Sequence, residues 1–284
     1  MPKKDGEVLF YSNKFDKDFE YLIALSIRQA KKNISIFSYG FYNTPLIKLL
    51  EKRKEEGIDV NLFLDAKYAK PRDTTLNIIC NPMRGLMHKK CIIIDDNLVF
   101  LGSTNITTTS LKLHKNLIIG IKNTNLAKCI LHEKHYKDEK VELFCTGNKD
   151  QKLLELIISH INRANKSIHL AMFTFTHKKL LMSILKAHKR GVKLHIYLDK
   201  MQSAGCCKYV VKALNEQGVK IKYNNSLPLL HHKLCIIDDK QVITGSLNWT
   251  VAAFEKNKEL VLILNDINQN QKKALHEILY LLDK

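Results

Sequence analysis

The sequence lacks several features that define whole classes of protein. Among its 284 residues, no apolar run approaches the roughly 18 residues that a membrane-spanning helix needs. The N-terminal segment carries lysines but no apolar stretch after them, so we expect no signal peptide. No low-complexity tract is present, which argues against a long disordered region. These absences predict a globular cytoplasmic protein with one large domain or two of ordinary size.

Paired cysteines and metal-binding cysteine patterns are also missing. The seven cysteines are an odd number, and no two of them have CxxC spacing. Cys91 and Cys235 lie within apolar runs that are typical of buried strands. We therefore expect reduced, mostly buried thiols, with no zinc site and no other cofactor.

Acidic residues are scarce relative to basic ones. Asp and Glu number 28 against 46 Lys and Arg, which gives a formal net charge of +18. Such a charge attracts polyanions, either nucleic acid or an anionic membrane surface. It does not choose between them, and a basic protein can also simply be soluble.

What the chain does contain is one unusual string that occurs twice, 143 residues apart. The first copy reads His88-x-Lys90-x4-Asp95-x6-Gly102-Ser103-x-Asn105, and the second reads His231-x-Lys233-x4-Asp238-x6-Gly245-Ser246-x-Asn248. Of the eighteen positions from 88 to 105, ten are identical in the second copy. Chance does not explain such agreement, so the chain contains an internal repeat.

The repeat extends over nearly the whole chain. Residues 27–34 align with 161–168 and residues 57–65 with 191–199, both at an offset of 134. The offset then becomes 143, so the second copy has nine extra residues within 200–230. Insertions belong in loops and at the rims of sites, so we expect this segment at the mouth of the site.

Within each copy, the hydrophobic pattern alternates between helix and strand periods. The expected helices cover 15–32, 44–56, 124–138, 150–165, 177–190 and 266–283. The expected strands cover 34–41, 58–64, 90–94, 98–101, 116–122, 167–175, 192–198, 233–237, 241–244 and 257–264. Strands that are apolar at successive positions indicate mixed sheets covered on both faces. We therefore predict an α/β fold of two pseudo-symmetric α/β/α sandwich modules, residues 1–138 and 139–284, packed around one shared active site.

Each string brings together the groups that phosphate chemistry uses. His88 and Lys90 stand two apart on an expected strand, so we expect both side chains on the same side of it. Ser103 and Asn105 follow the next strand and are expected to share a direction. One copy thus offers an imidazole for nucleophilic or proton-transfer work, and an ammonium and hydrogen-bond donors for phosphate oxygens.

Two such copies are needed for a complete phosphodiesterase site. Facing each other across a pseudo-two-fold axis, one of His88 and His231 attacks phosphorus to form a phosphohistidine. The other protonates the leaving oxygen and then activates water. The groups expected to neutralise and orient the phosphate are Lys90, Lys233, Ser103, Asn105, Ser246 and Asn248. This chemistry needs no divalent metal, and the sequence has no carboxylate cluster that would hold one.

The duplicated string resembles the HKD signature of the phospholipase D superfamily. Both copies match it at every fixed position, with Asp95 and Asp238 completing it, and the resemblance covers nearly the whole chain. It implies the two-step histidine mechanism without a metal cofactor. It does not choose a substrate, since the family includes phospholipases, lipid synthases, nucleases and tyrosyl-DNA phosphodiesterases. We expect the two aspartates to support the fold and the site geometry, and not to contact phosphate.

Family members often have a glutamate eleven residues after the motif asparagine, hydrogen-bonded to the catalytic histidine. That position is Glu259 in the second copy and Asn116 in the first. Because a carboxylate partner raises a histidine pKa, we predict that Glu259 backs His231 as the general acid. His88 is then the nucleophile. The alternative is that the substitution is neutral, or that another carboxylate fills the gap.

Two substrate classes fit the resemblance. The chain is similar to the small nuclease-like branch, and its charge suits DNA or RNA, so we predict a metal-independent nuclease that binds nucleic acid. The lysines near the motifs in sequence are Lys89, Lys112, Lys115, Lys240, Lys256 and Lys258. The alternative is a phospholipase D that hydrolyses phosphatidylcholine or anionic lipids to phosphatidic acid at a membrane. Retention of both histidines and both lysines disfavours a binding module without catalysis, and a monomer suffices because two motifs complete one site.

The remaining histidines and the aromatic residues near the motifs are expected to have structural roles. The histidines expected at surface or packing positions are His114, His132, His135, His160, His169, His177, His188, His195 and His276. Most aromatic residues near the motifs are expected in the core, with Trp249 the most open to stacking on a base.

Overall fold

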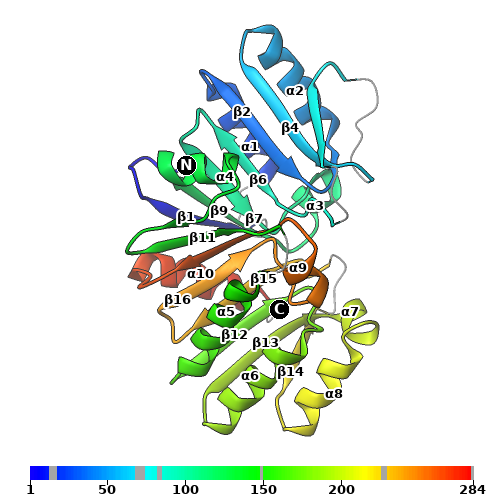
Figure 1. Cartoon of the computed structure of the whole chain (residues 1–284), viewed down its shortest axis with the longest axis vertical. Coiled ribbons are helices and arrows are strands. Elements are labelled where there is room, and N and C mark those ends of the chain that lie inside the picture. Colours follow the sequence, from blue (N-terminus) through cyan, green and yellow to red (C-terminus); the bar gives the residue numbers. More distant parts are fainter. Residues whose placement is uncertain (13–17, 68–73, 82–84, 148–149, 225–228, 283–284) are drawn as a thin grey trace.

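Two β-sheets organise the chain, one in each half. The computed structural model describes residues 1–12, 18–67, 74–81, 85–147, 150–224 and 229–282. Figure 1 shows the two halves as lobes, one above the other, with their inner strands adjacent at the centre. The sequence repeat is therefore also a repeat of structure.

The first sheet has seven strands in the order β1-β9-β7-β6-β2-β4-β5. Their bounds are β1 (Val8–Ser12), β2 (Asn33–Ser38), β4 (Asp59–Asp65), β5 (Asn77–Asn81), β6 (Cys91–Ile94), β7 (Leu98–Gly102) and β9 (Leu117–Lys122). Strands β2, β4 and β5 run parallel, and the other pairs are antiparallel. Because β6 runs against β2, the residues just before β6 lie beside the C-terminal end of β2.

The second sheet repeats this arrangement in the order β10-β11-β17-β16-β15-β12-β13-β14. Its strands are β10 (Tyr136–Lys137), β11 (Val141–Cys145), β12 (Ser167–Met172), β13 (Lys193–Asp199), β14 (Ile221–Asn224), β15 (Lys233–Ile237), β16 (Gln241–Gly245) and β17 (Leu260–Leu264). Strand β15 runs against β12 as β6 runs against β2. A separate two-stranded pair joins β3 (Phe41–Tyr42) to β8 (Ile106–Thr107).

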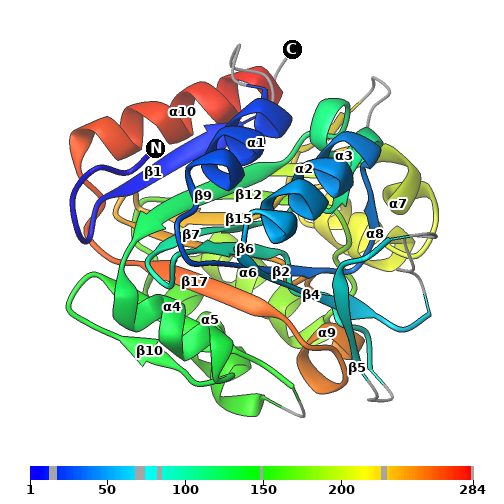
Figure 2. The ribbon, with the colours of Figure 1, turned by 90° about the horizontal axis from the view of Figure 1, so that it is seen from above.

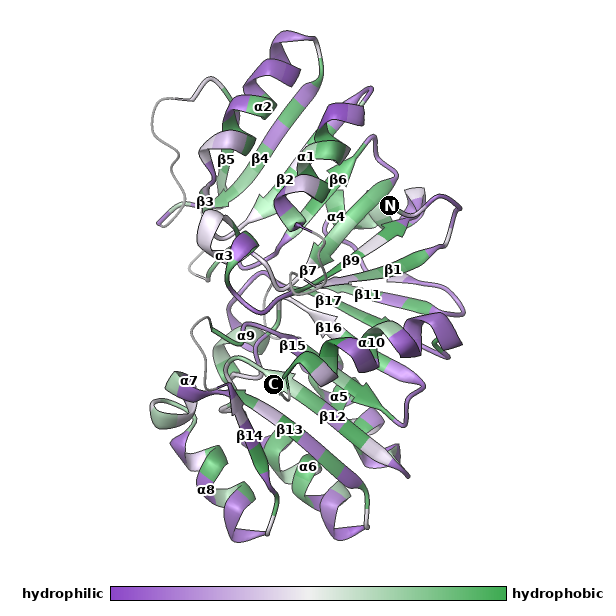
Figure 3. Cartoon of the chain, turned by 180° about the vertical axis from the view of Figure 1, so that it is seen from behind, coloured by the Kyte–Doolittle hydropathy of each residue, from purple (hydrophilic) through white to green (hydrophobic). Residues whose placement is uncertain are grey.

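Amphipathic helices cover the outer face of each sheet. They are α1 (Phe19–Gln29), α2 (Thr44–Glu55) and α3 (Thr108–Lys112) in the first half, and α5 (Gln151–Arg163), α6 (Lys178–Lys189), α7 (Lys200–Ala204), α8 (Lys208–Glu216) and α9 (Val251–Glu255) in the second. Polar caps define several starts, as where the Asn43 side chain accepts the amide of Leu46 at 2.9 Å. In Figure 3 the helices carry hydrophilic turns, whereas central strands such as β6 and β9 are largely hydrophobic.

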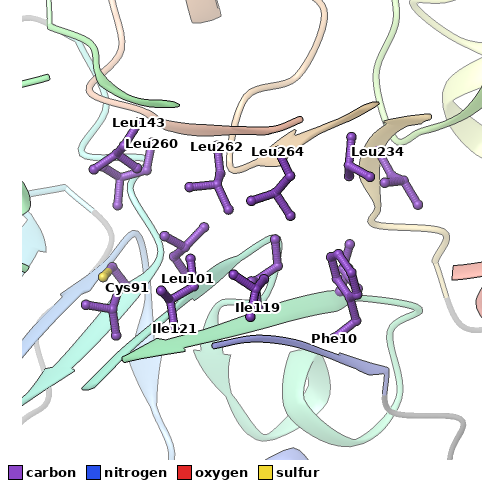
Figure 4. Packing of buried hydrophobic residues seen from close by; sticks show 14 of the residues in the cluster. Phe10, Cys91, Leu101, Ile119, Ile121, Leu143, Leu234, Leu260, Leu262 and Leu264 are labelled. Carbon is purple, nitrogen blue, oxygen red and sulfur yellow. The ribbon is translucent and has the colours of Figure 1, made fainter. Parts of the chain in front are cut away.

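The inner faces of the two sheets pack on each other in one continuous core. Leu101 and Ile119 of the first sheet belong to the same buried cluster as Leu262 and Leu264 of the second. Figure 4 shows these side chains facing one another between the sheets. Burial of this apolar surface holds the halves together, so the catalytic edge of one sheet is fixed relative to that of the other.

Helices α4 (Thr124–Leu131) and α10 (Gln269–Leu282) complete this inner core. Figure 2 shows α10, from the C-terminal end of the chain, beside β1 of the first sheet. There Gln271 Nε2 donates to the carbonyl of Val8 at 3.3 Å. The ends of the chain therefore also tie the two halves together.

The predicted α/β architecture of two pseudo-symmetric sandwich modules is confirmed. The division into residues 1–138 and 139–284 remains a proposal, and the short strand β10 pairs with β11 across that boundary. No helix within the described ranges has the length and apolar content needed to cross a bilayer.

Some predicted elements need correction. The helix expected over 124–138 ends at Leu131, because Glu133 has a left-handed backbone (φ 55°) and the chain then enters β10. Strand β6 begins at Cys91, so His88 and Lys90 precede it. Strands β1, β5, β11 and β14 and helices α3, α7, α8 and α9 were not predicted; all except α8 have only four or five residues, too few to show a clear period.

Candidate active site

The two halves exchange backbone contacts at the edge where β6 and β15 begin. The amide of His88 donates to the carbonyl of Lys258 at 2.9 Å, and the amide of His231 donates to the carbonyl of Lys115 at 2.9 Å. Isolated parallel bridges link the residues just before each histidine to the same two lysines. Each motif histidine is therefore held in place by a segment of the other copy.

His88 has a buried carboxylate as its partner. Its Nδ1 donates to Glu259, at 2.9 Å from Oε1 and 2.8 Å from Oε2. Glu259 is fully buried and also accepts from the Asn257 amide at 3.2 Å. The Nδ1 proton is thus committed to Glu259, which leaves Nε2 as the nitrogen available for chemistry.

His231 has an amide as its partner instead. Its Nδ1 lies 3.1 Å from Asn116 Oδ1. The Nδ2 group of Asn116 donates to the carbonyl of Ser110 at 2.9 Å, which fixes the orientation of the amide. Asn116 is completely buried. This half-site therefore has a neutral amide where the other has a carboxylate.

The prediction that Glu259 backs His231 is therefore wrong. The pairing crosses between the copies, because Glu259 directly follows Lys258, whose backbone is bonded to the strand end that carries His88. Asn116 likewise follows Lys115 and reaches His231. Alignment within one copy cannot reveal a contact that is made with the other copy.

The two motif serines hold these partners. Ser103 Oγ donates to Asn116 Oδ1 at 2.8 Å, and Ser246 Oγ donates to Glu259 Oε2. Each hydroxyl also accepts a backbone amide, from Leu117 at 3.0 Å and from Leu260 at 2.9 Å respectively. Since both hydroxyls are engaged inside the protein, we revise their expected contact with phosphate and assign them to positioning the partners of the histidines.

Both motif lysines are buried beside their histidines. Lys90 Nζ donates to the carbonyl of His88, and Lys233 Nζ donates to the carbonyl of His231, each at 2.8 Å. An aromatic ring accompanies each ammonium, with Tyr39 5.9 Å from Lys90 and Phe173 5.0 Å from Lys233. These rings were expected mainly as core residues, yet they also line the motif lysines.

Burial weakens the cationic state of both lysines, and Lys90 weakens that of Lys233 further. Burial lowers the pKa of Lys90 to about 7, although Glu259 acts in the opposite direction. The pKa of Lys233 lies well below its usual value, because of burial and then of Lys90. A site that holds two such ammonium groups close together in a low dielectric is suited to bind an anion between them.

The two histidines differ in their electrostatic surroundings. Burial lowers the pKa of His88, but the carboxylate of Glu259 opposes that effect. The pKa of His231 lies well below its usual value through burial, followed by Lys233, Lys90, His88 and His114. The pKa of Glu259 is lowered by His88 and Lys90 in spite of its burial, so this group is ionised. Positive charge is thus better tolerated on His88 than on His231.

The motif aspartates lie at the opposite ends of β6 and β15 from the histidines. Asp95 accepts the amides of Lys31 and Lys32 at 2.9 and 2.7 Å. Asp238 accepts the corresponding amides of Asn165 and Lys166 at 3.0 and 2.7 Å. Each aspartate therefore binds the loop that joins a helix to the following strand, α1 to β2 for Asp95 and α5 to β12 for Asp238. We keep both in the proposed site as supports of the fold.

Two further aspartates at the catalytic edge were missed. Asp65 Oδ2 accepts the amide of Met87 at 2.8 Å, and Asp199 Oδ2 accepts the amide of Leu230 at 3.1 Å. Each is buried and orients the residue before a motif histidine. The signal was present, since both end the repeated segments 57–65 and 191–199.

The fixed glycines of the motif have a steric reason. A Cβ on Gly102 would lie 2.1 Å from the carbonyl of Leu117, and one on Gly245 would lie 2.1 Å from the carbonyl of Leu260. Gly245 also has a φ of 140°. This close approach lets the following serine reach Asn116 or Glu259.

The remaining predicted residues divide into two groups. The Oδ1 atoms of Asn105 and Asn248 are buried and accept no hydrogen bond from the described part of the chain. A phosphate would accept from the Nδ2 groups instead, so the predicted role of both amides at the phosphate stays a proposal. Trp249 is only 2% exposed and packs edge-on against Phe175, so base stacking by it is excluded in this conformation. His114 was expected at a surface or packing position, but it lies beside His231, with ring centroids 6.0 Å apart.

Comparisons with known proteins agree with this geometry. A family model described as cardiolipin synthase, PLD-like domain, matches residues 23–133 and 157–278. Over 123 residues the chain is 35% identical to a mitochondrial cardiolipin hydrolase of Xenopus tropicalis. This alignment covers 43% of this chain and 55% of that protein. Over 115 residues it is 36% identical to a phospholipase D of Rickettsia felis, covering 39% of this chain and 56% of that protein. The chain spans about half the length of these curated relatives.

Solved structures extend the likeness to both halves. Phosphatidylserine synthase of Haemophilus influenzae superposes with a TM-score of 0.77 over 96% of this chain and 85% of its own, at 14% identity, which shows a shared fold. The Nuc protein of Salmonella typhimurium covers 49% of this chain and 91% of its own, at 25% identity and a TM-score of 0.44.

Proposed function

The chain belongs to the PLD-like domain family, and we propose that it is a phosphodiesterase that acts through a phosphohistidine on His88. The observation that carries this proposal is the pairing of two buried imidazoles whose Nδ1 atoms are both engaged, each beside its own lysine. Both Nε2 atoms are then left for reaction, one for attack and one for proton transfer.

The assignment of the nucleophile to His88 rests on how charge moves during the first step. As His88 Nε2 bonds to phosphorus, its ring gains positive charge, and Glu259 lies 2.8 Å from its Nδ1 to stabilise that charge. As His231 gives its proton to the leaving oxygen, its ring loses positive charge, which its lysine-rich surroundings favour. A site that stabilises the charge distribution of the transition state over that of the ground state accelerates the reaction. The nucleophile is the residue predicted from the sequence, but for a different reason.

The second step reverses these roles. Water attacks the phosphohistidine, and His231 accepts a proton from it as the P–N bond to His88 breaks. Lys90 and Lys233 are proposed to neutralise the phosphate throughout, with Asn105 and Asn248 orienting it. These steps use only protein side chains, so the proposed reaction proceeds without a metal ion.

For the substrate we keep a nuclease acting on DNA or RNA as the first candidate. Its support is the net charge of +18, which favours a polyanion. The lysines near the motifs give less support than expected, because Lys89 and Lys115 are buried and Lys258 pairs with Glu133 at 2.9 Å. Lys112 is exposed but pairs with Glu20 at 3.2 Å, and Lys240 and Lys256 are exposed. A cytosolic location stays part of this proposal, supported by the free state of all seven cysteines.

A phospholipase is the second candidate, and the names of the relatives favour it. Proteins described as cardiolipin hydrolase and phospholipase D match 36–43% of the chain at 30–37% identity. Either substrate places an alkoxide as the leaving group, so the proposed roles of the histidines are the same for both.

One assay separates the candidates. The protein is incubated in EDTA with single-stranded DNA, duplex DNA, RNA, and vesicles of cardiolipin or phosphatidylcholine, with His88→Ala as the control. Cleavage of nucleic acid that the variant loses supports the nuclease. Release of phosphatidic acid without strand cleavage supports the phospholipase, and a requirement for a divalent metal contradicts the proposed mechanism.

A further inference from the structure

The two copies differ at a second position beside the carboxylate-to-amide change. Residue 257 in the second copy corresponds to residue 114 in the first, at the same offset of 143. Asn257 supports its half-site, because its Nδ2 donates to Glu259 Oε1 at 3.2 Å. In the first copy this position is His114, two residues before Asn116. The first copy therefore has an amide where the second has a carboxylate, and an imidazole where the second has an amide.

His114 is placed to interact with His231. The two ring centroids lie 6.0 Å apart with the planes tilted by 48°. The carbonyl of His114 accepts from Asn116 Nδ2 at 3.4 Å, and Asn116 Oδ1 faces His231 Nδ1 at 3.1 Å. His114 is half-buried, whereas His231 is only 7% exposed. His114 therefore links a buried ring to the solvent.

The proposed chemistry creates a need for such a link. His231 must carry a proton before the first step, yet the charged and titratable groups that act on it, Lys233, Lys90, His88 and His114, all lower its pKa, in addition to its burial. The carboxylate of Glu259 is bonded to His88 and not to His231. The free site thus disfavours a proton on His231, and the charge of a bound phosphate anion would favour one.

His114 has a balance of charges that lets it exchange a proton. Its pKa is lowered by burial and by Lys233, while Asp199 raises it. A substrate phosphate between the lysines would offset their charge and make His231 the better base. Two rings this close titrate as a coupled pair, in which a proton on one disfavours a proton on the other.

We propose that His114 is a positioning residue for the proton of His231, an inference that rests on the proposed role of His231 as the general acid. The negative charge of the bound phosphate favours a proton on this pair of rings, so His114 takes up a proton from solvent and passes it through one bridging water to His231 Nε2. His231 then gives this proton to the leaving oxygen as that P–O bond breaks and the bond from His88 Nε2 to phosphorus forms. Solvent supplies the proton through His114, so no oxidant, metal or further reactant is needed.

The test is His114→Asn, which copies the side chain of Asn257, assayed with two leaving groups. A single-stranded oligonucleotide, or cardiolipin vesicles if lipid is the substrate, has an alkoxide leaving group that needs a proton. Bis(p-nitrophenyl) phosphate has a phenolate that leaves without one. We expect a loss of about tenfold or more in the single-turnover rate with the alkoxide substrate and less than about twofold with the phenolate substrate. The loss should grow as the pH rises, because fewer His231 rings are then protonated.

Two further variants make every outcome decisive. His132→Asn changes an exposed histidine at the end of α4 and is expected to leave both rates unchanged. His231→Ala should show the same dependence on the leaving group as His114→Asn, but larger. Equal losses with both substrates, or no loss with either, would overturn the role of His114. If His231→Ala also loses both activities equally, the assignment of the general acid fails as well.

Discussion

The half-sites of His88 and His231 share a backbone and differ in charge. In both, the histidine amide is bound by the opposite copy, a lysine ammonium lies 2.8 Å from the histidine carbonyl, and a motif serine holds the partner of Nδ1. That partner is the carboxylate Glu259 for His88 and the amide Asn116 for His231. The repeat thus preserves geometry while its side chains distribute charge unequally.

In the proposed mechanism, this difference determines which histidine attacks. A symmetric site would allow either histidine to attack. Here a cation on His88 is stabilised by Glu259, while a cation on His231 is opposed by its neighbours. The asymmetry therefore teaches that two copies of one motif need not have equivalent roles, and that the partner of each histidine decides its role.

The largest expected effect comes from removing either histidine. His88→Ala should abolish cleavage of both the alkoxide and the phenolate substrate, because no nucleophile remains. His231→Ala should lower the alkoxide rate by about 10³-fold or more, yet release one equivalent of p-nitrophenol in a burst before turnover stalls. Stopped-flow absorbance measures the burst, and a burst in His88→Ala but not in His231→Ala would reverse the assignment.

The next effect concerns the partners of the histidines. Glu259→Gln should lower the rate by about 10²-fold, because the cationic ring of His88 loses its counter-charge. Since Glu259 raises the pKa of His88, its loss should also move the acidic limb of the pH profile to lower pH. The matched change, Asn116→Asp, adds a carboxylate beside His231 and should raise the pKa of that ring. Rate against pH for both variants tests the contrast, and shifts in the same direction contradict it.

A smaller effect is expected from the charge of Lys90. With a pKa of about 7 in the free enzyme, this ammonium loses its proton as the pH rises through neutrality, and kcat/KM should fall with it. Lys90→Arg keeps its charge at every pH of interest, so the basic limb should move to higher pH even if the maximal rate drops about tenfold. An unchanged basic limb would show that another group controls it.

The smallest effect on catalysis is expected at the motif aspartates. Asp238→Asn should cost about 1–3 kcal/mol of unfolding free energy, because it weakens hydrogen bonds from three backbone amides. Those amides hold the pKa of Asp238 below its ordinary 3.8 despite partial burial. A depressed folded pKa contributes stability above pH 3.8 that is lost as the pH falls through the folded value. Denaturant melts at pH 7 and pH 3 measure this, and a variant that stays stable but loses catalysis would assign the residue to the reaction.

The sequence was sufficient to predict the fold, the motif residues and their duplication. The spacing of His88 and Lys90 matches that of His231 and Lys233, and the repeated apolar runs became paired strands. The short elements could not be predicted, because β1, β5 and β11 are defined by their pairing in a sheet.

The partners of the histidines could not be predicted from one copy at a time. Glu259 reaches His88 only because the segment around Lys258 crosses to the other half. The same crossing, through Lys115, brings His114 beside His231. Contacts between repeats depend on how the two sheets pack, and the periodicity of either repeat does not contain that information.

The most direct test of the unequal half-sites is to find the residue that carries phosphorus. His231→Ala is mixed with bis(p-nitrophenyl) phosphate, quenched at alkaline pH after the burst, and digested for phosphopeptide mapping by mass spectrometry. We expect one p-nitrophenyl-phosphoryl group on Nε2 of His88, because the attack displaces only one of the two p-nitrophenolates. A burst without phosphorylated His88, or phosphorus on any other side chain, would contradict this expectation.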